Sequence, residues 1–284
     1  MRKLLLLSLT LLSLTANAQL DVFSEQLDRP ATVDTARYKI TYSLDYACHP
    51  QVDVRFQDVR DVLVGRHAVK DFSDVIFHYD SLATEDMRKG KDAFFNPKGT
   101  PWPVEVLLSA KGKQADMKRR LPLGMGTLSY RDSVPTFDWE FVADTTRTIL
   151  GYECQLATTR FAGRDYSAWY THELPLPYGP YKFGGLPGLI VRIQDAESQF
   201  VWSMTGFERS DEPIIVYEYS NEKKCTAEEA DKTVRRYYEA PLTVQLAAIG
   251  GGKGRIMIVG KDGKTRDATE VEDTPIPYKP LETR

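Results

Sequence analysis

Residues Tyr38–Tyr46 read YKITYSLDY, and this stretch decides the fold class more clearly than any other part of the chain. Tyrosine, isoleucine and leucine occupy every second position, with lysine, threonine, serine and aspartate between them. Because successive side chains of a strand point to opposite faces, the pattern predicts a strand with one buried and one solvated face, as in an antiparallel sheet.

Comparable patterns recur along the chain at the spacing typical of all-β proteins. Two β-prone runs flank a short link that contains Gly163, and such a pair is typical of a hairpin. Besides Tyr38–Tyr46, the sequence predicts strands at residues 52–56, 75–79, 137–141, 154–161, 166–170, 189–193, 200–205, 214–219 and 255–259.

Helix is predicted in two places. The clearer one covers Ala227–Glu239, where Thr226 and Glu229 have the spacing of a capping box and Pro241 lies just beyond the end. Residues 84–91 are expected to form one or two further turns. The sequence therefore predicts a mainly β protein with one or two helices.

The first residues have the features of a secretory signal peptide. Arg2-Lys3 precedes an apolar run at residues 4–14, and Ala16-Asn17-Ala18 supplies small residues at the expected cleavage site. The run is shorter than the roughly 20 residues of a membrane-spanning helix. We therefore expect residues 1–18 to be removed and residues 19–284 to form a single domain without a membrane span, in the periplasm or outside the cell.

Charge and cysteine content restrict the partners and the covalent links. The chain holds 37 Lys and Arg against 40 Asp and Glu, a net charge of −3, and loss of Arg2 and Lys3 with the signal peptide leaves about −5. A mildly acidic protein gives no reason to expect nucleic acid as a partner. Cys48, Cys154 and Cys225 allow one disulfide in three different pairings, and the sequence does not choose among them.

The most conspicuous segment is residues 179–190, which read GPYKFGGLPGLI. A glycine-rich loop ahead of apolar residues can cradle a phosphate, but neither phosphate-loop spacing is present and Pro187 lacks an N–H donor. Pro187-Gly188 instead fits the two central positions of a type II turn, which predicts a positive φ at Gly188. Gly184, Gly185, Pro187 and Gly188 are therefore predicted to be structural.

The sequence identifies no catalytic residue, no metal site and no cofactor. His172-Glu173 begins like a zinc-binding H-E-x-x-H motif, yet Pro175 and Leu176 follow where a helix and a second histidine are needed. The G-x-S-x-G elbow of hydrolases does not occur. Cys154 falls within a predicted strand, where a small buried residue is the usual role of cysteine.

Residues 179–190 resemble the signature of the GLPGLI family, a group of exported Bacteroidetes proteins named after that run of residues. The resemblance extends upstream, in the same order, through Trp139, residues 149–154, residues 166–171 and residues 174–175. It implies a protein of the bacterial cell envelope, and it assigns no activity. The strand layout is more distantly similar to the lipoprotein carriers LolA and LolB, which fold as a strongly curved antiparallel sheet with an apolar interior.

These observations predict a single strongly curved antiparallel sheet or half-barrel, LolA-like, that binds a molecule without transforming it. The first hypothesis is a lipid or other apolar ligand on the concave face. The alternatives are docking of an outer-membrane transporter or another envelope component, and a hydrolase-type enzyme with an unrecognised site. Aromatic residues, which bury about 150–250 Å² each, are abundant near the motif. The predicted ligand-binding residues are Trp169, Tyr181, Phe183, Leu186 and Leu189.

Overall fold

The computed structural model describes residues 22–91, 95–109, 113–248, 257–259, 265–267 and 272–282, and the expected signal peptide lies outside these ranges. The helices are α1 (Asp74–Arg88), α2 (Ala227–Glu239), α3 (Pro241–Ala248) and a short 3-10 turn at Pro122–Gly124. The strands are β1 (Leu27–Thr35), β2 (Tyr38–Tyr46), β3 (Phe56–Val64), β4 (Ala68–Ser73), β5 (Val104–Ser109), β6 (Gln114–Arg120), β7 (Thr127–Ser133), β8 (Glu140–Ile149), β9 (Tyr152–Phe161), β10 (Arg164–Thr171), β11 (Leu189–Asp195), β12 (Phe200–Arg209), β13 (Pro213–Tyr219), β14 (Glu222–Lys224), β15 (Met257–Val259) and β16 (Thr265–Asp267).

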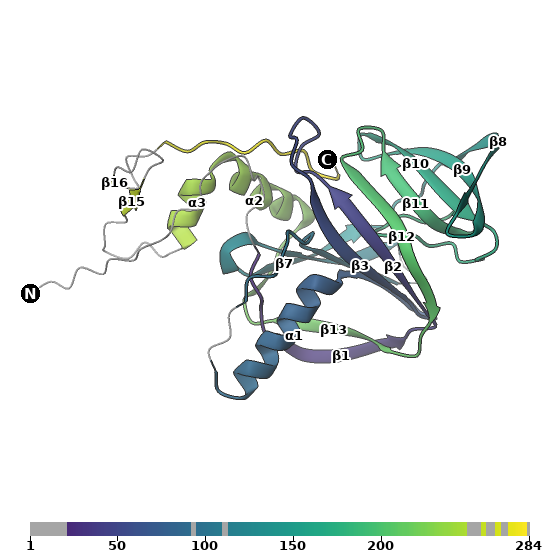
Figure 1. Ribbon diagram of the computed structural model, residues 1–284. Coiled ribbons are helices and arrows are strands. Elements are labelled where there is room, and N and C mark those ends of the chain that lie inside the picture. Colours follow the sequence, from purple (N-terminus) through teal and green to yellow (C-terminus); the bar gives the residue numbers. More distant parts are fainter. Residues whose placement is uncertain are drawn as a thin grey trace, which may run out of the picture.

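One large open sheet dominates the molecule (Figure 1). Its twelve strands follow the order β14-β7-β6-β5-β4-β3-β2-β12-β11-β10-β9-β8, and β1 with β13 and β15 with β16 form two small separate sheets. Every pairing in the large sheet is antiparallel except that of β14 with β7. The pairing of β2 with β12 joins the two halves of the chain. The predicted mainly β, antiparallel fold is confirmed.

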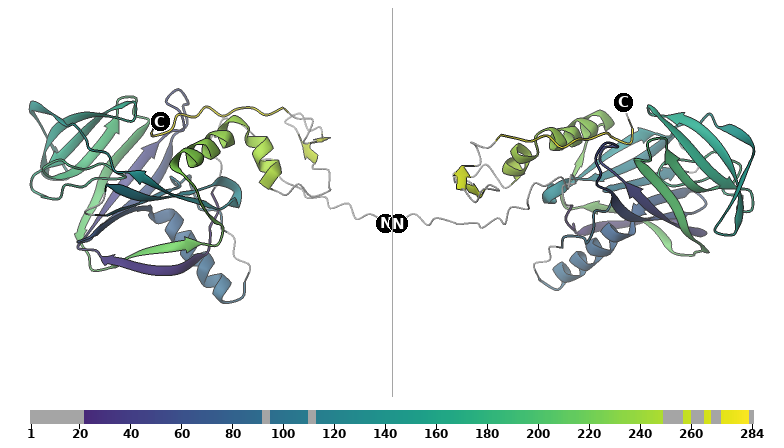
Figure 2. Two further views of the ribbon diagram at one scale, coloured as in Figure 1. Left: turned by 180° about the vertical axis from the view of Figure 1, so that it is seen from behind. Right: turned by 45° about the horizontal axis from the view of Figure 1, so that its top comes forward.

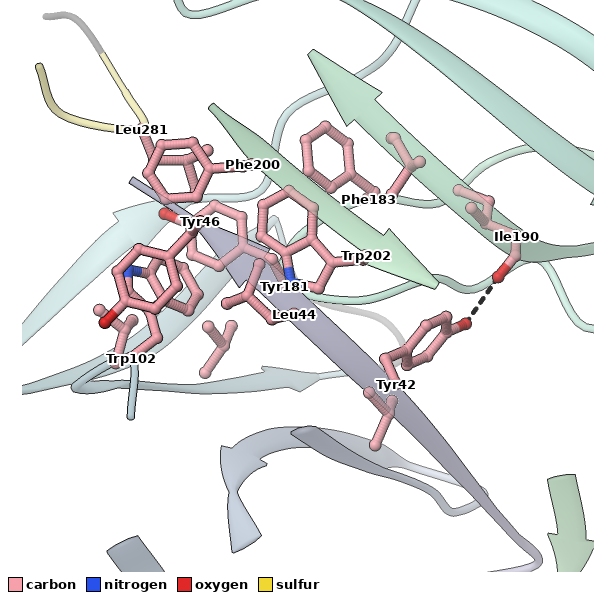
Figure 3. Packing of buried hydrophobic residues seen from close by; sticks show 14 of the residues in the cluster. Tyr42, Leu44, Tyr46, Trp102, Tyr181, Phe183, Ile190, Phe200, Trp202 and Leu281 are labelled. Carbon is pink, nitrogen blue, oxygen red and sulfur yellow. Dashed lines mark hydrogen bonds between the residues drawn. The ribbon is translucent and has the colours of Figure 1, made fainter. Parts of the chain in front are cut away.

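The core lies on one face of this sheet, as the alternation in β2 predicted. Tyr42 and Leu44 are completely buried, whereas Ser43 between them is exposed. Trp202 of β12 pairs with Leu44, and its ring contacts the ring of Trp102 edge to face at 6.0 Å. Figure 3 shows these rings packed together around β2 and β12. Helix α2 closes this face beside β7, where Ala230, Val234 and Tyr237 are buried.

The helices confirm one prediction and correct another. Helix α2 has the predicted capping box, in which Thr226 and Glu229 bond each other's backbone N–H. Residues 75–79, predicted as a strand, belong instead to α1, which contacts β1, β3 and β4. Its buried residues have helical spacing, but one of them is the charged Asp80, so the apolar period of the helix is interrupted in the sequence. The predicted turns at residues 84–91 lie largely within the same helix.

Two predicted strands begin later than expected. Of residues 52–56, only Phe56 enters a strand, because Val52 N–H bonds the carbonyl of His49 in a turn. Strand β8 starts at Glu140, so most of the predicted strand at 137–141 is a connection that leads into it. The predicted hairpin is confirmed, since β9 and β10 pair across Ala162 and Gly163.

Candidate functional site

Residues 178–188, called the motif loop below, lie on the core face of the sheet between β10 and β11. Tyr181, Phe183 and Leu186 are buried, with 6%, 1% and 1% of their surface exposed. The Phe183 ring lies 4.8 Å from the ring of Tyr166 and 5.8 Å from that of Trp202. Figure 3 shows Phe183 beside Trp202 and Ile190 in this cluster. The motif loop therefore supplies a part of the core.

Four of the five predicted ligand-binding residues come together in this core. Leu189 is completely buried, and it lies in the same cluster as the buried Tyr181, Phe183 and Leu186. Trp169 is half-buried and packs at the margin of this cluster. Two pockets of about 30 and 20 Å³ lie elsewhere on the sheet, each with room for about one water, and none of the five residues lines either of them. A ligand role for these side chains stays a prediction.

Hydrogen bonds fix the backbone of the motif loop to distant strands. The Tyr181 N–H donates to Asp71 Oδ2 of β4 at 2.6 Å. Beyond the loop, the Tyr42 hydroxyl donates to the carbonyl of Ile190 at 2.7 Å, as Figure 3 shows. Tyr181 itself has a φ of +59°, a left-handed conformation that is unfavourable for a residue with a side chain. The surrounding contacts therefore hold the loop in a conformation that its local sequence does not prefer.

A buried lysine anchors the same loop. The Lys182 side chain is 1% exposed, and its ammonium group forms ion pairs with Asp132 of β7 and with Glu282, the latter at 2.7 Å. Glu282 also accepts a hydrogen bond from the Tyr181 hydroxyl at 2.5 Å. A buried charge needs such partners because its desolvation costs several kcal/mol. Lys182 therefore ties the motif loop both to the sheet and to residues 272–282.

Glycine is needed at two positions of the motif, but not for the type II turn that the sequence predicted. Gly188 is not among the residues with positive φ, so the predicted type II turn is wrong. Instead, a Cβ at Gly188 would lie 2.0 Å from the carbonyl oxygen of Thr171 and 2.7 Å from its carbon. Gly185, by contrast, has a φ of +84°. The close approach of two backbones requires glycine at position 188, and the left-handed conformation favours glycine at position 185.

Strand β8 forms one end of the large sheet and is exposed along almost its whole length. Figures 1 and 2 show it at the outer margin of the molecule, away from the helices. Its pairing with β9 is interrupted between Phe141 and Thr146, where a bulge contains Asp144 with a φ of +52°. Phe141, Val142 and Leu150 expose 61%, 37% and 57% of their surface. An edge strand with apolar side chains is a surface on which another chain can dock.

The motif loop holds the beginning of this edge strand. The Trp139 indole N–H donates to the carbonyl of Gly184 at 2.9 Å. The Phe137 ring lies 5.3 Å from that of Phe183 and 5.3 Å from that of Phe161. The residues that lead into β8 are thus fixed by the same segment that the sequence singled out.

Sequence reasoning also missed buried ionic clusters outside the motif loop, of which the first surrounds Arg60. Arg60 is completely buried and donates to Asp58, to Asp71 and to the carbonyls of Trp102 and Val104. These bonds use all of its N–H groups, so the cluster has a structural role. The alternation of charged with apolar residues in β3 resembles that of a solvated face, and nothing in it signals a buried arginine.

The second cluster joins β6 to α1 and to residues before β1. Arg120 donates to both carboxylate oxygens of Asp80, at 2.6 and 2.7 Å, and its Nε lies 3.6 Å from Glu25. Burial raises the pKa of the Glu25 carboxyl; the Arg120 charge opposes this shift and the Asp80 charge adds to it. Glu25 also accepts a hydrogen bond from Thr127 at 3.2 Å.

The remaining candidate groups do not assemble into a site. Among the described residues, no group of three His, Cys, Asp or Glu side chains is placed to hold a metal ion. The three cysteines are free thiols, and Cys154 is buried as predicted. In the same ranges, none of the helices has the length and apolar character needed to cross a membrane.

Comparison with known proteins gives a short match in sequence. Residues 160–192 match the profile of a family described as "Protein of unknown function (Porph_ging)". The matched residues contain the run Gly185–Ile190, so the resemblance noted from the sequence is confirmed. No curated protein matches the sequence.

Solved structures resemble the fold at low sequence identity. Two structures of PNGF-II, in space groups P21 and C2, share 15% identity over 72% of this chain, with TM-scores of 0.44 and 0.43. The chain spans about a third of their length, 34% and 33%. The LolA superfamily protein NE2245 from Nitrosomonas europaea shares 14% identity over 63% of this chain and 88% of its own, with a TM-score of 0.26.

Proposed function

We propose that the protein is a non-enzymatic docking module of the cell envelope, which binds an extended segment of a partner protein along the open edge of its sheet at β8. The observation that carries the proposal is an edge strand of ten residues with one strand neighbour in the described part of the chain. The unpaired N–H and C=O groups of such an edge can form a ladder with an added strand.

Apolar side chains at both ends of β8 support this use of the edge. Phe141 and Val142 lie near its beginning, and Leu150 lies just beyond its end, all of them exposed. Leu150 and Gly151, with φ values of +52° and +85°, make the tight turn into β9. Such a turn favours Asn or Gly, and a left-handed conformation costs a leucine about 1–2 kcal/mol. Because the fold does not require this leucine, its exposed side chain is well explained as a contact for a partner.

The bulge in β8 limits which segment can pair. The irregular stretch between Phe141 and Thr146 separates two short regular parts of the edge, and bulges of this kind discourage unspecific pairing of sheets. A partner would therefore pair along residues 146–149 and meet Phe141 beyond the bulge. With export through the expected signal peptide, an outer-membrane transporter or another envelope protein with an exposed extended segment fits this surface.

The apolar-ligand hypothesis has weaker support from the same contacts. Tyr181, Phe183 and Leu186 fill the core face, so a lipid could enter only if the motif loop left it. That movement would remove Lys182 from its two carboxylate partners. The hydrolase hypothesis has no constellation of nucleophile and base to support it among the described residues.

Photo-crosslinking in the native host tests the proposal. A photoreactive residue at Val142 or Leu150 should give one discrete adduct whose crosslinked peptide maps to a single extended segment of an envelope protein. The same residue at Val59, which is 41% exposed in β3 and remote from the edge, is the control. Phe141→Asp should reduce the adduct at Leu150 by at least about ten-fold, because a charge would oppose an apolar contact.

Two results would contradict the proposal. One is an equal adduct at Val59, which would indicate unspecific contact. The other is the absence of an adduct together with co-purified lipid in the native mass spectrum, which would favour the apolar-ligand hypothesis.

A further inference from the structure

Residues 272–282, called the strap below, cross the end of the sheet without joining it. They have neither helix nor strand, and Figure 1 shows them (yellow) running past α3 and α2 toward the sheet. Leu281 is the one residue of the strap that is buried; Glu272, Thr274, Pro275 and Pro277 are exposed, and the other residues are partly buried. The strap takes part in none of the sheet pairings described above, so the sheet does not depend on it for its own ladders.

The protein holds the strap as a binding site holds an extended peptide. Arg164, 2% exposed, donates to the carbonyls of Leu281 at 3.1 Å and Pro280 at 2.6 Å. Gln199, completely buried, donates to the carbonyl of Lys279 at 2.7 Å. Three successive carbonyls of the strap are thus bound by buried side chains of β10 and the turn before β12.

Three side chains of the strap occupy separate positions along this groove. The Tyr278 ring stacks on that of Tyr238 at 4.0 Å and 4°, and its hydroxyl accepts a hydrogen bond from Arg119 at 3.0 Å. The Leu281 side chain enters the core beside Phe200, as Figure 3 shows. The Glu282 carboxylate binds the Tyr181 hydroxyl and the Lys182 ammonium group of the motif loop. Backbone bonds from Ile276 to Tyr238 and from Lys279 to Cys48 complete the contacts.

We propose that this groove is a peptide-recognition site, which the strap occupies as a ligand in the same chain and which a partner's segment of the same chemistry occupies in exchange. The side chains define the ligand class: an extended segment with an aromatic residue, a proline two positions later, and then an apolar and an acidic residue. Extended proline-containing peptides are bound in this way by aromatic side chains and by donors directed at their carbonyls. The site is separate from the β8 edge, so the two proposals can fail independently.

Exchange of the strap is tested on the full-length protein with a fluorescent peptide of residues 272–282. Leu281→Ala weakens the resident strap, and the apparent affinity for the peptide should rise at least about ten-fold over the wild-type protein, because less of the groove is occupied. The backbone carbonyl of Cys48 accepts a hydrogen bond from the Lys279 N–H of the strap. Labelling of the Cys48 thiol should therefore accelerate in parallel. Leu63→Ala, a matched change in a separate buried cluster of β3, should leave both readouts at wild-type values.

The proposal is overturned if folded Leu281→Ala protein binds no more peptide than Leu63→Ala protein, or if a peptide with aspartate in place of Leu281 binds equally well. Should Leu281→Ala not fold, hydrogen exchange of the wild-type protein decides. The amides of Ile276 and Lys279 should then exchange at least about ten-fold faster than that of Leu44, through local opening of the strap. Equal rates would show that the strap opens only with the whole fold.

Discussion

The glycine that the structure places closest to another backbone is Gly188, and its replacement should be the most damaging single change in the motif. In Gly188→Ala, the new Cβ would lie 2.0 Å from the Thr171 carbonyl oxygen, where ordinary contact needs 3.4 Å or more. Thr171 pairs with Leu189, so the obstructing group belongs to the β10–β11 ladder and cannot rotate away. Overpacking of this kind costs about 1–3 kcal/mol, and a backbone obstacle favours the upper end, about 3 kcal/mol.

Gly185→Ala is the matched control, because the same atom is added to the same loop for a different reason. A Cβ there would meet its nearest neighbour, the Trp139 indole nitrogen, at 3.9 Å, so only the φ of +84° opposes alanine. That strain costs about 1 kcal/mol. For a domain of this size, about 1 kcal/mol lowers the melting temperature by about 2–4 °C.

The melting temperature, followed by circular dichroism, should therefore fall by about 6–12 °C for Gly188→Ala and by about 2–4 °C for Gly185→Ala. The order of the two variants is the decisive result, since both lose the flexibility of glycine in the unfolded chain. If Gly185→Ala melts at or below the temperature of Gly188→Ala, the close approach of the two backbones does not govern the motif.

Two further predictions concern buried titratable groups. Burial raises the pKa of Glu25, so the wild-type free energy of unfolding should fall as pH rises through that raised pKa, above its usual value near about 4.3. Glu25→Gln lacks this loss, and urea midpoints of the two proteins should diverge in the variant's favour as pH rises above about 4; parallel curves would contradict the assignment. Burial raises the pKa of the Cys48 thiol to about 11 and the pKa values of Cys154 and Cys225 above their usual value, so exposure sets the order of reaction. Because Cys225 is half-exposed and the other two thiols are buried, a thiol reagent should modify Cys225 at least about ten-fold faster than either, and early labelling of Cys154 would be the contrary result.

Local sequence patterns predicted the parts of the fold that local physics determines. The alternation in Tyr38–Tyr46 predicted β2 residue for residue, and the capping residues predicted α2 at both ends. The turn at Gly163 predicted the β9–β10 hairpin. In each case the signal and the structure that it specifies lie within about a dozen residues.

Helix α1 could not be predicted in the same way, because one of its buried positions is charged. Asp80 faces the interior only because Arg120, forty positions later, binds both of its carboxylate oxygens. Without knowledge of that partner, the apolar residues at 75, 77 and 79 resemble an alternating strand. The Ser73–Asp74 start, in which the Ser73 hydroxyl accepts the Ile76 N–H, was the available signal for the helix.

The position of the motif loop shows where apolar content stops being evidence for a ligand. Burying apolar surface contributes about 25 cal/mol per Å² whether the covering atoms belong to a ligand or to the chain itself. Composition therefore predicts that Tyr181 and Phe183 need a cover, without saying what covers them. Polar groups discriminate better, because each needs a partner of its own.

In the motif loop, the polar groups already have partners from distant parts of the fold. The Tyr181 N–H binds Asp71, and Lys182 binds Asp132 and Glu282. A loop that opens for a ligand would separate these groups each time, at a cost of about 1–3 kcal/mol for each buried group left unpaired and more for a charge. The loop is therefore better suited to be a fixed support, and the carbonyl of Gly184 that receives the Trp139 indole directs that support to the start of β8. Recognition is then expected at the exposed edge that the loop positions.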